Sequence, residues 1–218
     1  MNEQTPPTPL PVTQQPQMPR LRLDFYNTAV LMSRWEDDGR LVTHPVSVHD
    51  VVSACTNVEL SSGLLPANTL FWKQRANQAM LGVYVPARRW DVQTDDHTYH
   101  LPMPPFVFVG SESSYKIFAV KKRPLNEAEP LYHAPCPNVH TTGGICHGNT
   151  PFPICSPQTI QQALQLFMEG SLFNVDLSRG KCQSHPDDVR VLWAKLDGRK
   201  RFPLSELVSA QMSLWNLI

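Results

Sequence analysis

The chain has 218 residues, and its 19 basic and 19 acidic side chains cancel to a formal net charge of zero. A chain of this length can bury one good hydrophobic core as a single domain. Without a net charge it has no overall field that would favour nucleic acid or an anionic membrane surface as a partner. No apolar run approaches the roughly 20 residues needed to cross a bilayer, so we expect a soluble protein.

The cysteines and the N-terminus indicate a reducing compartment. Five cysteines form an odd set without regular spacing, which does not suggest a disulfide framework. The start Met-Asn-Glu-Gln-Thr lacks the basic residues and apolar core of a secretion signal. We therefore expect a cytoplasmic protein.

The first 20 residues differ in composition from the rest of the chain. They contain six of the 21 prolines, set among glutamine and threonine. Such a segment is too polar to bury a core element. The sequence predicts a disordered proline-rich tail over residues 1–20 and a single domain over residues 21–218.

Local patterns predict strands through the first half of this domain. A first strand begins at Leu21, where apolar residues alternate with polar ones. A short helix is expected over residues 46–55, because Ser47 precedes an apolar group.

Two hairpins are expected next. Residues 69–72 and 81–85 are rich in aromatic and β-branched side chains and are separated by the polar segment 73–78, which indicates two strands with a longish connection. Residues 106–109 and 115–120 flank a turn-forming Gly-Ser-Glu-Ser-Ser cluster that would close a second hairpin.

A long segment without periodicity follows the strands. Residues 121–157 hold seven prolines, three glycines and three of the five cysteines. Loops of this length without secondary structure are usually functional or disordered. The apolar and aromatic content of this one favours an ordered, functional loop.

Three helices are expected after the loop. The first starts at Ser156-Pro157, with serine as N-cap and proline at the first helical position, carries an apolar stripe over residues 160–168 and stops at Gly170. A second begins at residues 186–188, and a third runs from about residue 204 to residue 215. Strands that precede helices predict an α+β domain, in which an antiparallel β-meander of four to five strands packs against C-terminal helices.

One stretch of the long loop carries candidate chemistry. Asn138 follows Pro137 in a turn, and Cys146 follows eight residues later with glycines on both sides. A thiol can form or receive a thioester, and an asparagine amide can donate to the oxyanion of that reaction. The glycines keep bulk away from the thiol and suggest that another chain approaches its backbone closely. A buried inert thiol, and an asparagine that only satisfies the turn, are the alternatives.

The order of these features resembles the ubiquitin-conjugating enzyme (UBC) superfamily. Its members carry a Tyr-Pro-x-x-Pro-Pro-type element before the last sheet strand, which Tyr99-His-Leu-Pro-Met-Pro-Pro105 matches loosely. They also carry a His-Pro-Asn turn eight residues before the catalytic cysteine. Here the turn reads Cys136-Pro137-Asn138, so the corresponding cysteine is Cys146.

Four segments are similar to the bacterial family called PRTRC system protein B, or prokaryotic conjugating-enzyme family D, and the similarity covers most of residues 21–218. They are Pro66-Ala-Asn-Thr-Leu-Phe-Trp72, Phe118-Ala-Val-Lys121, Leu131-Tyr-His-Ala-Pro135 and Gly144-Ile-Cys-His-Gly-Asn149. The resemblance implies a role beside a ThiF-type (E1-like) activating enzyme, a small ubiquitin-like modifier and a JAB-type protease.

Two features depart from the superfamily pattern. Cys136 stands where the turn usually has histidine, and an additional hairpin around Gly110 lengthens the interval between the proline element and the turn. The catalytic details are therefore expected to differ from those of the eukaryotic enzymes.

The sequence thus predicts a ubiquitin-like-protein conjugating enzyme (E2-like) that carries its modifier as a thioester on Cys146, with Asn138 as oxyanion donor and without a cofactor. Supporting roles are assigned to Cys136, Pro137, His147 and Tyr132.

Two other functions remain as alternatives. The first is a non-catalytic scaffold that keeps the fold and binds the modifier or the activating enzyme. The second is a zinc-binding module, because six soft ligands crowd into the loop: His133, Cys136, His140, Cys146, His147 and Cys155. The absence of a Cys-x-x-Cys or His-x-x-x-His spacing argues against the zinc module.

Overall fold

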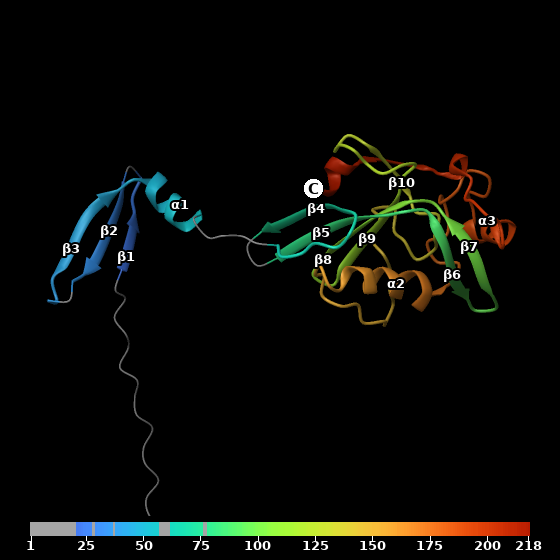
Figure 1. Ribbon diagram of the computed structural model, residues 1–218, viewed down its shortest axis with the longest axis horizontal. Helices are drawn as coiled ribbons and strands as arrows, with labels where there is room; N and C mark the ends of the chain where they lie inside the picture. The colour runs from blue at the N-terminus through green and yellow to red at the C-terminus, as the bar shows by residue number, and fades with distance from the viewer. Residues whose placement is uncertain (1–20, 28, 37, 57–61, 76–77) are drawn as a thin grey trace, which may run out of the picture. The chain divides into compact units, whose positions relative to one another are not determined.

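In the computed structural model, the described residues are 21–218 with the exception of 28, 37, 57–61 and 76–77. The predicted proline-rich tail lies outside the described residues. The chain separates into two compact units, residues 1–61 and 62–218 (Figure 1). The sequence predicts a single domain from residue 21 onwards, and that domain organisation stays a prediction.

The first unit is a small antiparallel sheet followed by a helix. The strands β1 (Leu21–Phe25), β2 (Val30–Trp35) and β3 (Leu41–Val46) pair in chain order, and the helix α1 (Val48–Thr56) follows. The strand expected at Leu21 and the helix expected over residues 46–55 are therefore confirmed. The alternating apolar face of β1 is not a buried face, because Leu21 is 52% exposed and Phe25 67% exposed.

A six-stranded antiparallel sheet organises the second unit. Its strand order is β12-β10-β9-β8-β5-β4. The strands are β4 (Thr69–Arg75), β5 (Gln78–Val85), β8 (Phe106–Ser111), β9 (Ser114–Ala119), β10 (Pro130–His133) and β12 (Ser209–Ser213). Both predicted hairpins are present. The first is tighter than expected, because β4 and β5 extend into the predicted connection and leave only residues 76–77 between them.

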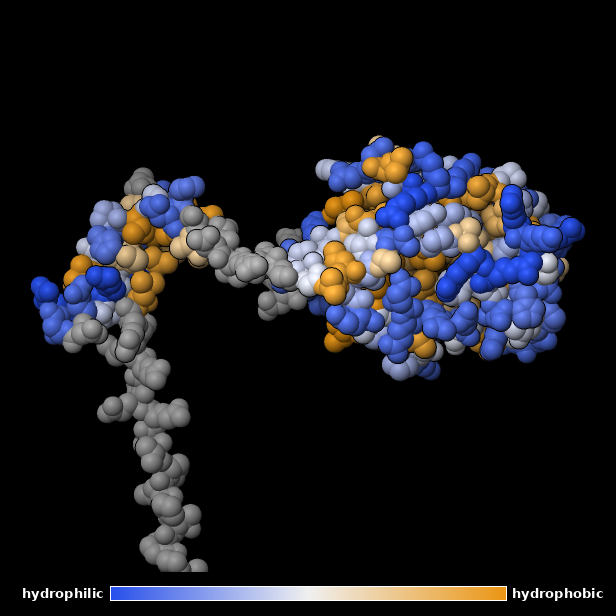
Figure 2. Space-filling model, viewed as in Figure 1, coloured by the Kyte–Doolittle hydropathy of each residue, from blue (hydrophilic) through white to orange (hydrophobic). Residues whose placement is uncertain are grey.

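Strand β8 lies between two hydrophobic cores, which explains its uninterrupted apolar sequence. Phe106 and Phe108 face the main core, while Val107 and Val109 face a smaller core on the other side of the sheet. Successive side chains of a strand point to opposite faces, so a strand covered on both faces needs apolar residues at every position. On the visible surface of this unit, hydrophilic side chains are interspersed with apolar patches (Figure 2).

A second, three-stranded sheet was not expected from the sequence. It consists of β6 (Arg88–Thr94), β7 (Thr98–Met103) and the short β11 (Leu172–Phe173), which runs parallel to β6. In β6, Trp90, Val92 and Thr94 are buried and alternate with exposed residues. This period of two was the available sequence signal for the strand.

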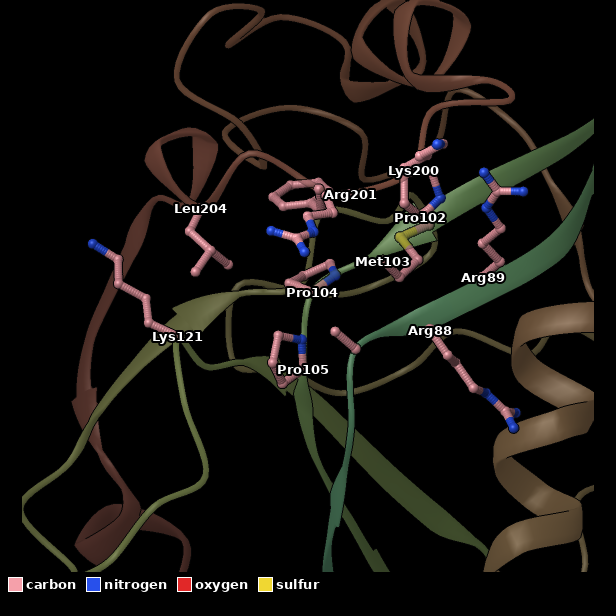
Figure 3. Close-up of a pocket in the computed structure, with 12 residues that line it drawn as sticks. Arg88, Arg89, Pro102, Met103, Pro104, Pro105, Lys121, Lys200, Arg201 and Leu204 are labelled. Carbon is pink, nitrogen blue, oxygen red and sulfur yellow. The ribbon is translucent and has the colours of Figure 1, made fainter.

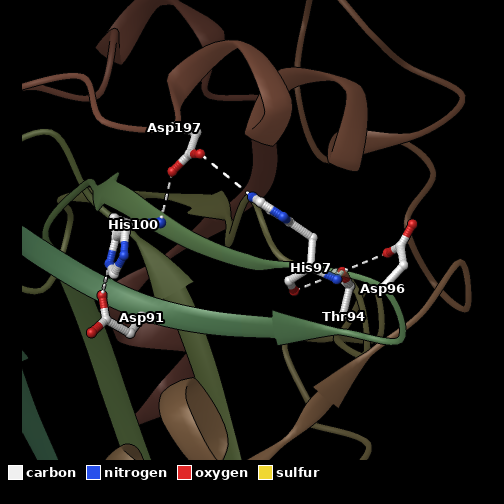
Figure 4. Close-up of polar contacts among 6 residues, drawn as sticks. All are labelled: Asp91, Thr94, Asp96, His97, His100 and Asp197. Atoms are coloured by element: carbon white, nitrogen blue, oxygen red, sulfur yellow. Dashed lines mark hydrogen bonds and ion pairs between the residues drawn. The ribbon is translucent and has the colours of Figure 1, made fainter.

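Polar contacts tie the β6–β7 hairpin to the end of a helix (Figure 4). One carboxylate oxygen of Asp197 accepts the backbone N–H of His100 at 2.8 Å, and the other lies 3.6 Å from Nε2 of His97. The backbone N–H of His100 is the main cause of a lowered pKa at Asp197. Within the hairpin, the side chain of His100 contacts that of Asp91 across the two strands.

Two of the three predicted helices are present. The helix α2 (Ile160–Gly170) buries its predicted stripe in the main core and ends at Gly170. It starts later than expected, with Thr159 at the N-cap position, because Ser156 forms a hydrogen-bonded turn with Thr159 ahead of the helix. The helix α3 (Val189–Leu196) begins after Asp188, as predicted.

The prediction of a third helix over residues 204–215 is wrong. This segment forms the 3-10 turn η1 (Leu204–Glu206), the strand β12 and the 3-10 turn η2 (Leu214–Leu217). Strand β12 pairs antiparallel with β10, where Leu131 lies opposite Met212. Pairing with a strand far away in the sequence outweighs local helix propensity, which is a weak preference.

Candidate functional site

The predicted Asn138 and Cys146 are brought together by a small hairpin. Val139 and Ile145 form an antiparallel bridge, and the N–H of His140 donates to the carbonyl of Gly144 at 2.8 Å. The N–H of Cys146 donates to the carbonyl of Asn138 at 2.7 Å. The eight-residue interval in the sequence therefore places the two residues directly across a hairpin.

This hairpin is held against strand β9. The N–H of Ile117 donates to the carbonyl of Gly143 at 2.9 Å, and the N–H of Ile145 donates to the carbonyl of Tyr115 at 3.0 Å. The backbone on the cysteine side of the hairpin thereby continues the sheet past β9. The thiol is carried by a loop with a rigid base.

Gly143 explains part of the glycine content of the loop. Its φ is +82°, and a Cβ there would lie 2.2 Å from the ring of Phe118. Both the backbone conformation and the close packing exclude a side chain. The group that packs closely against Gly143 is thus a side chain of this protein, whereas the sequence suggests the approach of another chain. Gly148, with φ of +53°, has open space around it.

Cys146 is exposed at the edge of a pocket of about 290 Å³. The hairpin contributes Asn138 and Cys146, and the residues after it contribute His147, Gly148, Asn149 and Thr150. The opposite wall comes from the end of α2 and the segment after it, with Ser171, Leu172, Asn174 and Asp176. These four wall residues were missed by sequence reasoning, because nothing local in the sequence links them to the loop.

Asn138 joins the hairpin to that opposite wall. Its side-chain amide donates to the carbonyl of Leu172 at 3.1 Å, and its backbone N–H donates to the carbonyl of Asp176 at 2.9 Å. Its φ of +57° lies in the left-handed region, which asparagine tolerates better than most residues. One amide hydrogen is thus committed to the structure, and the second has no partner among the described residues.

His147 lies beside the thiol in the same pocket. Its ring is half-buried and packs on Phe152 with a centroid distance of 4.7 Å. Nδ1 is buried and has no hydrogen-bond partner among the described residues. This nitrogen is therefore closed to a molecule that enters the pocket.

The other cysteines of the second unit differ from Cys146 in exposure. Cys136, Cys155 and Cys182 are all buried. Burial raises the pKa of Cys136 to about 12 and that of Cys155 to about 11. A thiol with so high a pKa supplies almost no thiolate near neutral pH. A role for Cys136 as a second reactive thiol would require this burial to be relieved.

The remaining predicted residues, Pro137 and Tyr132, do not line the Cys146 pocket. Pro137 is buried under the turn, and Tyr132 lies on β10 and pairs with Ala119. The Nζ atom of Lys121 lies 4.9 Å from the centroid of the Tyr132 ring, and Tyr132 lines a different cavity.

A metal site requires several ligands around one point, and the loop does not provide it. Among the described residues, no group of three or more histidine, cysteine, aspartate or glutamate side chains lies close enough to hold a metal ion. The zinc-binding alternative thus lacks a preformed site in this part of the chain.

The comparison with known families gives the class of this protein. Residues 47–210 match prokaryotic E2 family D, so the chain belongs to that family and the resemblance inferred from the sequence is confirmed. The α+β fold, dominated by antiparallel sheets with few helices, is compatible with an E2-like fold. No curated protein and no solved structure matched the chain. None of the described helices is both long and apolar enough to span a membrane.

Proposed function

We propose that this protein is an E2-like conjugating enzyme that carries a ubiquitin-like modifier as a thioester on Cys146. The observation that carries the proposal is the exposure of Cys146 directly across a hairpin from Asn138, within the segment that matches the family. The three other cysteines of the second unit are buried. We also infer that residues 62–218 follow the UBC arrangement.

The chemistry consists of two acyl transfers. The thiolate of Cys146 attacks the thioester carbonyl that links the modifier to its activating enzyme, a new C–S bond forms, and the thiolate of the activating enzyme leaves. An acceptor amine then attacks the thioester on Cys146, loses a proton, and the Cys146 thiolate leaves as an amide bond forms. Both steps pass through an oxyanion, which a positioned hydrogen-bond donor stabilises.

Asn138 is the proposed donor. Its bond to the Leu172 carbonyl orients the side chain, and the second amide hydrogen is available for the oxyanion. One such donor contributes roughly 2.7 to 4 kcal/mol in a well-studied protease. His147 also lines this pocket, and we propose that it receives the proton that the attacking amine loses.

By analogy with the family, the protein would act with three partners: a ThiF-type activating enzyme, a small ubiquitin-like modifier and a JAB-type protease. The modifier and the activating enzyme are the reactants that the two acyl transfers require. The protease would remove the modifier from its acceptor.

The thioester is tested by mixing the protein with its activating enzyme, its modifier and ATP, followed by non-reducing electrophoresis. We expect an adduct that reductant removes and that Cys146→Ala abolishes. Cys55→Ala is the matched control, because Cys55 is also exposed but lies in the first unit, and this variant should keep the adduct. An adduct that survives Cys146→Ala contradicts the proposal.

The role of Asn138 is tested by comparing thioester formation with transfer to an amine. Asn138→Ala should slow transfer by about 100-fold or more, the range seen when one oxyanion donor is removed. Modifier binding, measured separately, should change much less. Equal losses in binding and in transfer would assign Asn138 a structural role alone.

A modifier-binding scaffold is the second candidate. It is favoured by the bond from Asn138 to the Leu172 carbonyl, which already gives this amide a structural use. The scaffold predicts that the protein binds its modifier without any adduct on Cys146.

A further inference from the structure

A second cavity lies away from the Cys146 pocket and is lined by cations. It has a volume of about 510 Å³ and shares no lining residue with the pocket around Cys146. Five basic residues line it, and no acidic residue does: Arg88, Arg89, Lys121, Lys200 and Arg201. They come from three separate parts of the sequence, which the fold brings to one place (Figure 3).

These cations lack acidic partners in the protein. None of the five forms an ion pair with a described residue. Lys200 and Arg201 have no hydrogen-bond partner in the described part of the chain either, and both are exposed. A chain with equal numbers of acidic and basic residues thus leaves one region of uncompensated positive charge.

Two of the cations are already positioned by the structure. The Nη2 atom of Arg89 donates to the carbonyls of Gly198 and Arg199 at 3.3 and 2.9 Å, which anchors the turn that carries Lys200. The guanidinium of Arg88 stacks 3.4 Å above the ring of Trp90 and points away from the centre of the pocket (Figure 3). Arg89 therefore fixes the turn that carries Lys200 at the pocket, whereas the charge of Arg88 faces away from the pocket centre.

The base of the pocket is apolar and has few hydrogen-bond donors. It includes Pro102, Met103, Pro104 and Pro105, all of which are buried. Proline has no backbone N–H, so this base cannot form the cluster of backbone donors that typically cradles a phosphate. An apolar side chain, by contrast, could pack against these prolines.

The cations are spread across the pocket rather than gathered at one point. In Figure 3, Arg201 lies between Lys121 on one side and Lys200 with Arg89 on the other. A single phosphate is best held by donors that converge on it. Spread charges above an apolar base fit an extended chain with several carboxylates and an apolar side chain.

We propose that this pocket binds an extended acidic segment of a partner protein, with carboxylates at the basic rim and an apolar side chain on the proline base. Opposite charges across an interface raise the association rate and fix the orientation of the partner. Because the rim is exposed, binding should weaken as salt increases.

The test uses the full-length protein and a fluorescein-labelled peptide of alternating glutamate and leucine, followed by fluorescence anisotropy. Lys200→Glu combined with Arg201→Glu should weaken binding at least tenfold, about 1.4 kcal/mol. The matched control is Arg179→Glu combined with Lys195→Glu, which changes the net charge equally at exposed residues that do not line the pocket. The control should bind within about twofold of the unmodified protein.

Three results would overturn the proposal. The first is an equal loss of affinity in both double variants, which would indicate general attraction of charge. The second is undiminished binding of a peptide with glutamine in place of glutamate. The third is binding of inorganic pyrophosphate or of a single-stranded oligonucleotide that equals peptide binding and is lost in the same double variant.

Discussion

Gly143 lies in the turn of the hairpin that ends at Cys146, and its backbone packs against the ring of Phe118. Its φ is left-handed, and a Cβ at this position would lie only 2.2 Å from the Phe118 ring, which leaves no room for a methyl group. Its neighbour Gly144 has ordinary space, since the nearest atom to a Cβ there would be 3.8 Å away. The backbone conformation and the packing therefore require glycine at residue 143, whereas residue 144 has room for a side chain.

Gly143→Ala should lower the free energy of unfolding by about 2 kcal/mol, because it adds both overpacking and backbone strain. Gly144→Ala should change it by less than about 0.5 kcal/mol. Chemical denaturation of both variants measures the difference. Equal effects of the two substitutions would mean that the hairpin adapts to a side chain at residue 143.

At the scale of an element, the helix α3 is held at its start by Asp188. The carboxylate accepts the backbone N–H of Arg190 at 2.9 Å and forms an ion pair with its guanidinium at 2.8 Å. The side chain of Arg190 is the main cause of a lowered pKa at Asp188. A carboxyl whose pKa is lower in the folded state stabilises that state above its ordinary pKa. The stabilisation is lost as the pH falls through the lowered value.

Asp188→Ala should therefore reduce stability by about 1 kcal/mol at neutral pH, since it removes the N-cap. Asp188→Asn keeps a capping oxygen and should cost less. The deficit of Asp188→Asn against the unmodified protein should begin to shrink as the pH falls below about 4, the ordinary pKa of an aspartate, and should be smallest below the lowered pKa, where the native carboxyl is protonated too. Denaturation curves over this pH range measure it, and a deficit independent of pH would contradict the assignment.

The elements also show which local patterns were informative. The apolar stripe of α2 and the acidic start of α3 predicted both helices, because a helix forms its own hydrogen bonds and shows its buried face as a period in the sequence. Strand β12 carries no comparable pattern and exists because β10 offers it a free edge. That edge comes from residues far away in the sequence.

At the scale of the whole molecule, the boundary between the two compact units does not coincide with the start of the family match. The family match begins at residue 47 and includes α1, whereas the second compact unit begins at residue 62. The six-stranded sheet, the three-stranded sheet β11-β6-β7, both hydrophobic cores and the Cys146 pocket all belong to the second unit. This unit thus contains the elements that a stable fold requires.

A fragment of residues 62–218 should fold by itself and show the same main thermal transition as the full-length protein. The reason is that its cores are built from its own residues. Circular dichroism during heating measures the transition. A fragment that lacks cooperative unfolding would show that residues 1–61 are required for the stability of the second unit.

The candidate site was predictable in part. The pair Asn138 and Cys146 could be chosen from the sequence, because the turn and the glycines lie within a few residues of both. The wall opposite them, from Ser171 to Asp176, was not predictable, since it reaches the hairpin only through the packing of α2 and the pairing of β11 with β6. The basic pocket was not predictable either, because its cations lie in three separate segments of the sequence that only the fold brings together.

Sequence alone indicated the family, the helices α2 and α3 and the thiol to consider, because each depends on neighbouring residues or on a motif of fixed spacing. It could not decide which cysteines are buried and which are exposed, and it did not indicate that residues 209–213 form a strand. Burial and strand pairing depend on which distant segments meet. Local propensity contributes too little free energy to decide such contacts.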